Sequence, residues 1–380
     1  MAPISWESLP ADVLEMVFQK IENQDLGPLR LVTSTWRTAI DQNLKSFCIR
    51  RSRIIEDVES MGRLFPRLER INMHSMDDFV FCKLASIKSL TELDIKLHQT
   101  QIWTDVPFSR FSQICSYGVE YLTSLSSLAI FWVECYESRT VEMISTLTNL
   151  KSLSLKMRKK GQGPLSEHLS HLTKLTSLDL RLFPTGHLEF LSGFTNLEVL
   201  KLGQWVRGNL DATLLSSLTT LTRLELRKAM IGPPEIENGV GKLKNLTHLD
   251  ISLNRARDGS INALLELTEL THLDLSYNNV SGDGVRLLTG LVSLKRLHLN
   301  STTVGNAIEL LCPLTGLEVL ELEYTPTGLQ ELEGLSNFVS LREVNVRHLV
   351  NRTMNRKRLA RLLSTLPHIK FRFANRLLHN

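Results

Sequence analysis

Apolar residues recur along most of the chain with a single spacing. In each copy an apolar residue, usually Leu, is followed by others three and five positions later, and the positions between are mostly polar. This alternation places the last two apolar side chains on one face of a short strand. From Leu125 onward successive copies start 22 to 25 residues apart, and a fixed period of this size predicts a solenoid. The twelve copies begin at Leu68, Leu90, Leu125, Leu150, Leu175, Leu197, Leu221, Leu246, Leu270, Leu294, Leu317 and Leu341.

The motif resembles that of leucine-rich repeats. In that family an Asn after the strand bonds neighbouring backbone, and Asn254 and Asn278 occupy this place, with Thr302 and Thr325 in later copies. We therefore expect an α/β leucine-rich-repeat solenoid, a curved parallel sheet with short helices on its convex side. The segment Leu366-x-x-Ile-x-Phe fits a thirteenth strand. The apolar residues expected to complete the core from the convex side are Val280, Leu287, Leu288, Val304, Leu310 and Leu311.

The first fifty residues follow a helical pattern instead. Pro10 suits the first turn of a helix, where its missing N–H costs nothing. Apolar residues from Val13 to Ile21, and again from Leu26 to Ile40, recur at helical spacing. A helical hairpin of this length has more apolar surface than it can bury alone, so we expect it to pack against something else.

This segment resembles an F-box. Leu9-Pro10, Asp25-Leu26 and Trp36-Arg37 fall where the family's pattern places them, and Thr33 and Ile21 are mild departures from it. The F-box family binds a Skp-type adaptor, which links to a cullin–RING ubiquitin ligase, so the resemblance implies an apolar adaptor-binding face. The residues expected on that face are Leu9, Pro10, Val13, Leu14, Val17, Phe18, Leu26, Leu29, Val32 and Trp36.

Together the two resemblances imply a non-catalytic substrate receptor of a Skp–cullin–F-box ligase. The expected domains are the F-box helical domain (1–47), a helical joining segment (48–67), the leucine-rich repeats (68–346) and a basic C-terminal cap with a final strand (347–380). The alternative is a leucine-rich-repeat scaffold or inhibitor with no ligase role, in which the N-terminal helices only cap the first repeat.

Composition and charge bear on the cellular location of the protein. The net charge is +4, but residues 347–380 hold nine Lys or Arg and no Asp or Glu. This tail suggests a terminal cap with a solvated face, a nuclear-localisation patch or, less favoured, a nucleic-acid contact. The five cysteines are scattered, and neither a signal peptide nor a membrane span is evident. We therefore expect a reduced cytoplasmic or nuclear location.

The polar positions of the strands form a charged surface that is either solvated or used for docking. On the concave face they stack into columns, one reading Arg223, His248, His272, Arg296 and its neighbour reading Glu225, Asp250, Asp274, His298. Such columns neutralise each other, or they dock a partner of complementary charge. A metal site from two His and two Asp is a minor alternative. The residues expected to bind substrate are Arg223, Glu225, His248, Asp250, His272, Asp274, Tyr277, Arg296 and Tyr324.

One copy carries an insertion, and the chain lacks known catalytic motifs. The step from Leu90 to Leu125 is 35 residues, and the extra stretch within 98–121 holds four aromatic residues. It is either a binding loop or a longer convex helix that packs its own aromatics. No phosphate-binding loop, nucleophile elbow or zinc motif occurs, so we expect no enzyme activity and no cofactor.

Overall fold

The computed structural model describes residues 44–49, 65–73, 84–96, 122–131, 142, 144–156, 168–182, 188–203, 210–347 and 356–373. They fall into two compact units, Met1–Leu175 and Thr176–Asn380. In each unit short strands pair in parallel with the next strand along the chain. The predicted parallel sheet of a repeat solenoid is therefore confirmed.

The first unit contributes five of the described strands. They are β1 (Ser46–Ile49), β2 (Arg70–Met73), β3 (Glu92–Lys96), β4 (Ser127–Phe131) and β5 (Ser152–Lys156). The second unit contributes β6 (Ser177–Leu182), β7 (Val199–Leu202), β8 (Arg223–Leu226), β9 (His248–Asp250), β10 (His272–Asp274), β11 (Arg296–His298), β12 (Val319–Glu321), β13 (Glu343–Asn345) and β14 (Lys370–Arg372). Strand β14 is the one expected after Leu366.

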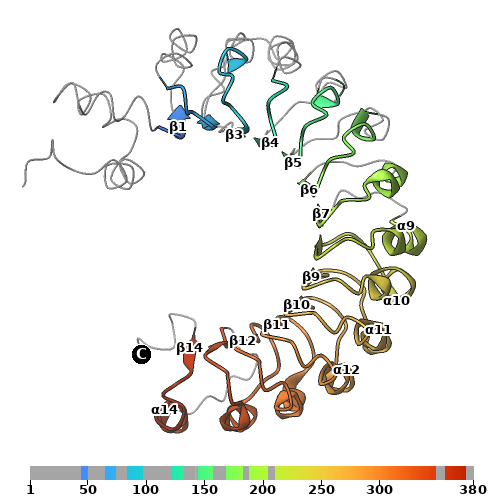
Figure 1. Cartoon of the computed structure of the whole chain (residues 1–380). Coiled ribbons are helices and arrows are strands. Elements are labelled where there is room, and N and C mark those ends of the chain that lie inside the picture. Colours follow the sequence, from blue (N-terminus) through green and yellow to red (C-terminus); the bar gives the residue numbers. More distant parts are fainter. Residues whose placement is uncertain are drawn as a thin grey trace, which may run out of the picture. The chain divides into compact units, whose positions relative to one another are not determined.

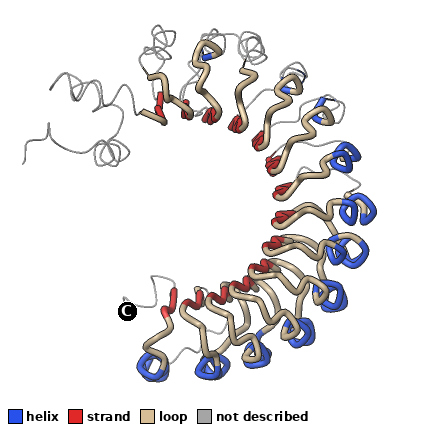
Figure 2. Tube along the Cα trace, in the orientation of Figure 1, coloured by secondary structure: helices blue, strands red, loops and turns tan. Residues whose placement is uncertain are grey.

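Short helices follow the strands of the second unit. They are α9 (Ala212–Ser217), α10 (Pro233–Asn238), α11 (Asp258–Leu264), α12 (Gly282–Leu288), α13 (Leu329–Glu333) and α14 (Arg356–Thr365), with the 3-10 turns η5 (Glu189–Gly193), η6 (Val240–Lys242), η7 (Gly305–Leu311) and η8 (Gly334–Asn337). Within this unit the strands line the inner side and the helices lie on the outer side (Figures 1 and 2). The predicted convex helices are confirmed here.

Strand β1 corrects the sequence reading. A helical joining segment was expected from residue 48, but Cys48 and Ile49 belong to β1, which pairs with β2. Leu44-x-x-Phe-x-Ile49 is a further copy of the repeat spacing, 24 residues before Leu68. Phe and Cys at strand positions hid it among the Leu-rich copies. The F-box residues before 44 and most of the expected joining segment lie outside the described residues.

The apolar spacing builds the core. Leu246, Leu249 and Ile251 are each at most 2% exposed, and the corresponding residues of neighbouring copies are equally buried. Burying one such side chain contributes roughly 1.5–3 kcal/mol. From the outer side, Val280, Leu288, Val304 and Leu311 complete the core as expected. Leu310 is 36% exposed and Leu287 only half-buried, because Ile308 and Val285 point inward on those turns instead.

Polar side chains that follow the strands form hydrogen bonds with the backbone where the chain turns. The Nδ2 of Asn278 donates to the carbonyls of Ile251 (2.9 Å) and Leu275 (3.0 Å), and its Oδ1 accepts from the N–H of Ala256 (2.9 Å). Thr302 replaces this Asn with a single bond to the carbonyl of Leu299 (2.5 Å). Buried backbone groups need such partners, so the predicted Asn column is confirmed as a structural feature.

In five successive copies, the residue seven positions after the leading Leu adopts an unusual backbone conformation. Lys228, Leu253, Tyr277, Ser301 and Tyr324 have φ between 53° and 58°, a left-handed region that few non-glycine residues enter. In each case the backbone N–H donates to a carbonyl of the next repeat, at 2.7 to 3.2 Å. The conformation therefore continues the bonding between repeats beyond the end of the strands.

The C-terminal segment holds the expected helix and strand. Helix α14 runs from Arg356 to Thr365, and its Leu362 is buried. Lys357, Arg358 and Arg361 are exposed, and Arg358 forms an ion pair with Glu333 at 2.8 Å. Among the described residues, no helix is long and apolar enough to span a membrane.

Candidate functional site

The inner face of the second unit is hollowed over six strands. The hollow has a volume of about 490 Å³ and brings together seven of the nine residues predicted to bind substrate. Tyr277 and Tyr324 do not line it; they follow the ends of β10 and β12 and are 45% and 46% exposed. The polar residues that line the hollow are Arg181, Lys201, Arg223, Glu225, His248, Asp250, His272, Asp274, Arg296 and His298.

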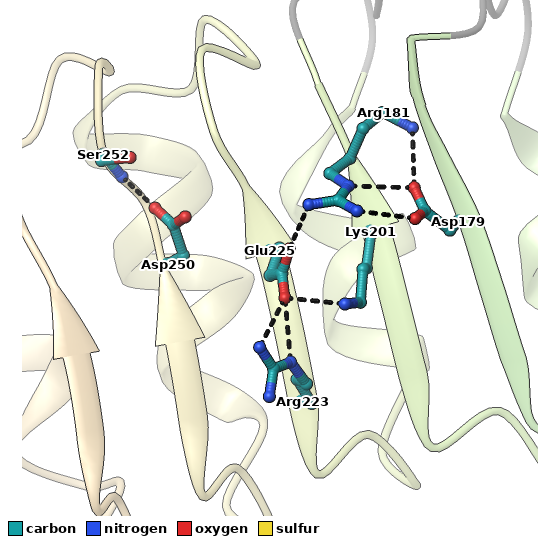
Figure 3. A network of polar contacts seen from close by, with 7 residues as sticks. All are labelled: Asp179, Arg181, Lys201, Arg223, Glu225, Asp250 and Ser252. Carbon is teal, nitrogen blue, oxygen red and sulfur yellow. Dashed lines mark hydrogen bonds and ion pairs between the residues drawn. The ribbon is translucent and has the colours of Figure 1, made fainter. Parts of the chain in front are cut away.

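Glu225, on β8, is the centre of a dense ion network (Figure 3). Its carboxylate contacts Lys201 at 3.0 Å, Arg223 at 2.8 Å and Arg181 at 3.2 Å. Burial alone would raise the pKa of Glu225, but the hydrogen bonds from Lys201 and Arg223 outweigh burial and lower it. Glu225 is therefore ionised, and its charge is fully compensated by its neighbours.

Arg181 ties this network to β6. Its guanidinium contacts the carboxylate of Asp179 at 2.9 Å as well as Glu225 two strands away. The bond to Asp179 raises the pKa of Arg181, against the effect of burial. Arg181, Lys201 and His298 were not among the predicted substrate residues. Lys201 and His298 occupy the same strand position as Glu225, Asp250 and Asp274, so the repeat spacing places them beside the predicted residues. Arg181 occupies a different strand position and reaches the site only through its long side chain.

Two histidines form a stacked pair over β9 and β10. The rings of His248 and His272 lie 4.0 Å apart at 14°. The Nδ1 of His272 is 2.8 Å from Oγ1 of Thr271, which in turn donates to the carbonyl of Thr247 at 2.9 Å. A hydroxyl has one proton to give, so Nδ1 must carry the proton and donate to Oγ1. The Nε2 of His272 is then a hydrogen-bond acceptor.

The same bonds recur at His248, where Thr247 Oγ1 lies 2.8 Å from Nδ1 and donates to the carbonyl of Thr222 at 3.1 Å. Burial lowers the pKa of His248, with Arg223 adding to the effect. Burial lowers the pKa of His272 to about 4, and the neighbouring His248 and the nearby arginines add to this effect because each would repel a proton on the ring. Both rings are therefore neutral at neutral pH, and each presents Nε2 as an acceptor.

The two central aspartates differ in their partners. Asp274 lies 3.5 Å from Nδ1 of His298. Burial opposes ionisation of Asp274, but the bonds from His298 and Ser276 lower its pKa. Burial likewise opposes protonation of His298, yet the bond to Asp274 raises the pKa of His298. Asp250 has no such partner: burial and the charge of Asp274 raise its pKa, against the bond from Ser252.

The alternative of a metal site is not supported. In the part of the chain that the structure describes, no group of three or more His, Cys, Asp or Glu is placed to hold a metal ion. Parallel strands about 4.8 Å apart hold equivalent side chains side by side and do not make them converge. The four aromatic residues of the insertion at 98–121 lie outside the described residues.

Comparison with known proteins identifies the N-terminal segment and supports the fold of the repeats. Residues 6–47 match the family model of the F-box domain. The chain carries an F-box followed by leucine-rich repeats. An F-box indicates a role in adaptor binding within ubiquitin ligases, and both families are in general non-catalytic interaction modules. The F-box match ends inside β1, so its last residues overlap the repeat copy that begins at Leu44.

A solved structure supports the repeat fold, and a second one is similar at a lower score. An internalin from Listeria monocytogenes aligns with a TM-score of 0.56 at 18% identity, covering 96% of this chain and 94% of that one. A leucine-rich-repeat protein from Leptospira interrogans aligns with a TM-score of 0.48 at 17% identity, covering 90% and 92%. At these identities the internalin likeness concerns the fold alone. A search of curated proteins found no match.

Proposed function

We propose that this protein is the substrate receptor of a Skp–cullin–F-box ubiquitin ligase. Its F-box binds a Skp-type adaptor, and its leucine-rich repeats bind the protein to be ubiquitinated. The observation that carries the proposal is the F-box match at residues 6–47, joined directly to a repeat sheet with a charged hollow. Neither part needs to perform chemistry.

The proposed mechanism is tethering. A receptor that holds a substrate beside an activated ubiquitin conjugate raises the effective concentration of the substrate's lysines there. A short, stiff connection preserves that gain better than a long flexible one. The F-box match and β1 share Ser46 and Phe47, so no intervening linker sequence separates the two parts.

Adaptor binding is tested by a double substitution in the F-box. Changing Leu9→Ala with Pro10→Ala removes apolar surface from the expected adaptor face, where one buried side chain contributes roughly 1.5–3 kcal/mol. We expect at least a tenfold loss of Skp-adaptor capture in a pull-down with purified proteins. Val292→Ala, at a 67% exposed position in the repeats, is the control and should bind normally.

The alternative function is a scaffold or inhibitor whose N-terminal helices only cap the repeats. It predicts that wild-type protein captures no adaptor, or that the double substitution leaves capture unchanged while the protein stays folded. Either result would remove the ligase role. The substrate can be sought by mass spectrometry of proteins that accumulate on this chain when the proteasome is blocked.

The proposed substrate surface is the hollow over β6 to β11. It combines part-buried or exposed cations on its flanks with buried or part-buried carboxylates and neutral imidazoles at its centre. Mixed charges of this kind orient a partner more than they add affinity. The competing interpretation is that the columns only neutralise one another. It fits Glu225, whose charge is compensated by three cations, whereas Asp250, one strand further along, forms no ion pair with the described residues and favours the docking proposal.

A further inference from the structure

The centre of the hollow is short of hydrogen-bond donors. Glu225 contacts three cations and Asp274 contacts His298. Asp250 is bonded by Ser252, whose backbone N–H donates to it at 2.9 Å, and no Lys, Arg or His among the described residues forms an ion pair with it. Figure 3 shows this contrast between Asp250 and Glu225.

The register of the strands concentrates negative charge at Asp250. Glu225, Asp250 and Asp274 are directly paired across β8, β9 and β10. Neighbouring strands lie about 4.8 Å apart, a distance at which like charges repel by about 1 kcal/mol even in water. Asp250 is the middle carboxylate of the three, and among the described residues no cation is in direct contact with it; Arg181 and His298 interact with it only through longer-range electrostatics. A positive charge placed directly over Asp250 would therefore be attracted by this carboxylate, while Arg223 and Arg296, which lower the pKa of the neighbouring histidines, would repel it from the two ends of their column.

The stacked imidazoles add acceptors of a second kind. His248 lies two residues before Asp250 on β9, and His272 is its neighbour on β10. Their Nε2 atoms, fixed as acceptors by the bonds from Nδ1 to Thr247 and Thr271, have no hydrogen-bond partner among the described residues. A guanidinium has five N–H donors, no acceptor and a flat face that stacks on aromatic rings. It therefore complements both the carboxylate and the imidazoles.

We propose that the hollow receives a single arginine side chain of a protein partner, seated over Asp250 beside His248 and His272. The inference rests on the proposed function, because it specifies what the substrate presents to the repeats. Arg223 and Arg296 stand at the two ends of the same column. Arg223 is 43% exposed on its side chain, and Arg296 is exposed with no ion-pair partner in the described residues. They disfavour further basic residues and favour acidic ones next to the arginine.

Peptide selection on the full chain tests the chemistry of the partner. A display library of random twelve-residue peptides is panned against the wild-type protein, and the enriched sequences are compared. We expect one position enriched in Arg, with Asp or Glu enriched near it. The best peptide is then synthesised with Arg and with citrulline, which keeps the shape of the side chain and removes its charge. Citrulline should weaken binding at least tenfold, because charge-assisted bonds are the strong ones.

A double-mutant cycle locates the contact. Asp250→Asn should weaken the Arg peptide at least tenfold and should not weaken the citrulline peptide further, because the two changes remove the same interaction. Asp283→Asn, an exposed carboxylate in the first turn of α12 on the outer side, is the matched control and should have no effect. Circular dichroism checks that each variant is folded.

Three outcomes would overturn the proposal. They are the absence of any enriched peptide, enrichment without a basic position, and unchanged affinity of the Arg peptide for Asp250→Asn. None of these readouts involves the F-box. Normal adaptor capture with no Arg selection would refute the arginine site alone, whereas Arg selection without adaptor capture would refute the ligase role alone.

Discussion

Asp250 and Asp274 occupy equivalent positions on adjacent strands, yet the fold treats their charges in opposite ways. The partner His298 lowers the pKa of Asp274, so ionised Asp274 stabilises the fold. Burial and the neighbouring carboxylate raise the pKa of Asp250, so ionised Asp250 destabilises the fold. A group whose charge costs stability without a partner is better explained by binding than by folding.

Replacing each aspartate by asparagine should therefore change stability in opposite directions. We expect Asp250→Asn to raise the free energy of unfolding, and Asp274→Asn to lower it, each by about 1 kcal/mol at neutral pH. The measurement is urea unfolding followed by circular dichroism. A loss of stability in Asp250→Asn as large as that in Asp274→Asn would contradict this account of Asp250.

The pH dependence of the two variants follows from the pKa shifts. The gain in Asp250→Asn is present above the raised pKa of Asp250 and disappears as pH falls through that value. The loss in Asp274→Asn needs charged His298, whose pKa is raised. The loss of stability is fully present between about pH 4 and about pH 6.5. It decreases as pH rises through the folded pKa of His298, because His298 then loses its charge. It also decreases in acid, because Asp274 is then protonated in the wild-type protein. Urea unfolding of both variants at about pH 5.5 and about pH 8 tests this difference: the stability loss in Asp274→Asn should be smaller at the higher pH, and the stability gain in Asp250→Asn should not.

The sequence located these side chains but did not reveal their partners. Repeat spacing alone placed Arg223, His248 and Asp250 on one face, because the alternation of a strand decides which way a side chain points. It left Arg181 out, because the reach of a long side chain across two strands depends on rotamers that spacing does not encode. The histidine tautomers likewise followed only from the positions of the Thr hydroxyls.

At the scale of the element, the repeat is a strand that cannot bury its apolar face alone. Each strand bonds only to the strands of neighbouring copies, so stability is close to a sum of repeat and interface contributions. The periodicity was sufficient to predict nearly every described strand and the helices outside them. It was not sufficient at β1, where Phe47 and Cys48 stand in place of the usual residues and the F-box pattern overlaps the repeat.

The coupling between repeats can be tested at Leu273, which is 1% exposed in β10. Leu273→Asp would bury an unpaired charge between two interfaces, at a cost of several kcal/mol. We expect far-UV circular dichroism to lose signal from more than one repeat. The control Val292→Asp adds the same charge at a 67% exposed position and should change stability by less than about 0.5 kcal/mol. A loss confined to one repeat would show that the copies fold independently.

At the scale of the whole molecule, the proposed receptor separates its two binding tasks along the chain. The expected adaptor face lies within the F-box match, and the hollow lies between β6 and β11. A change in one should leave the other intact, because the two surfaces share no residue and the energies of independent sites add. This separation is the property that a tethering device requires.

Charge reversal in the hollow tests that separation. We expect Asp250→Lys combined with Asp274→Lys to abolish substrate capture, because two added cations would repel a basic partner, while Skp-adaptor capture stays at the wild-type level. Capture is measured by mass spectrometry of proteins retained on the chain, with a pull-down of the adaptor in parallel. If substrate capture survives, docking lies elsewhere, and the insertion at 98–121 is the next segment to test.

The left-handed residue that ends each strand has a consequence for the evolution of new specificity. Five successive copies place chemically unrelated side chains at this position, from Lys228 to Tyr324, while the backbone N–H makes the same bond to the next repeat. The conformation is therefore set by the main chain, and it accepts side chains as different as those of Lys, Leu, Ser and Tyr. A row of positions spaced about 4.8 Å apart can thus be rewritten one by one to recognise a different target without redesigning the fold.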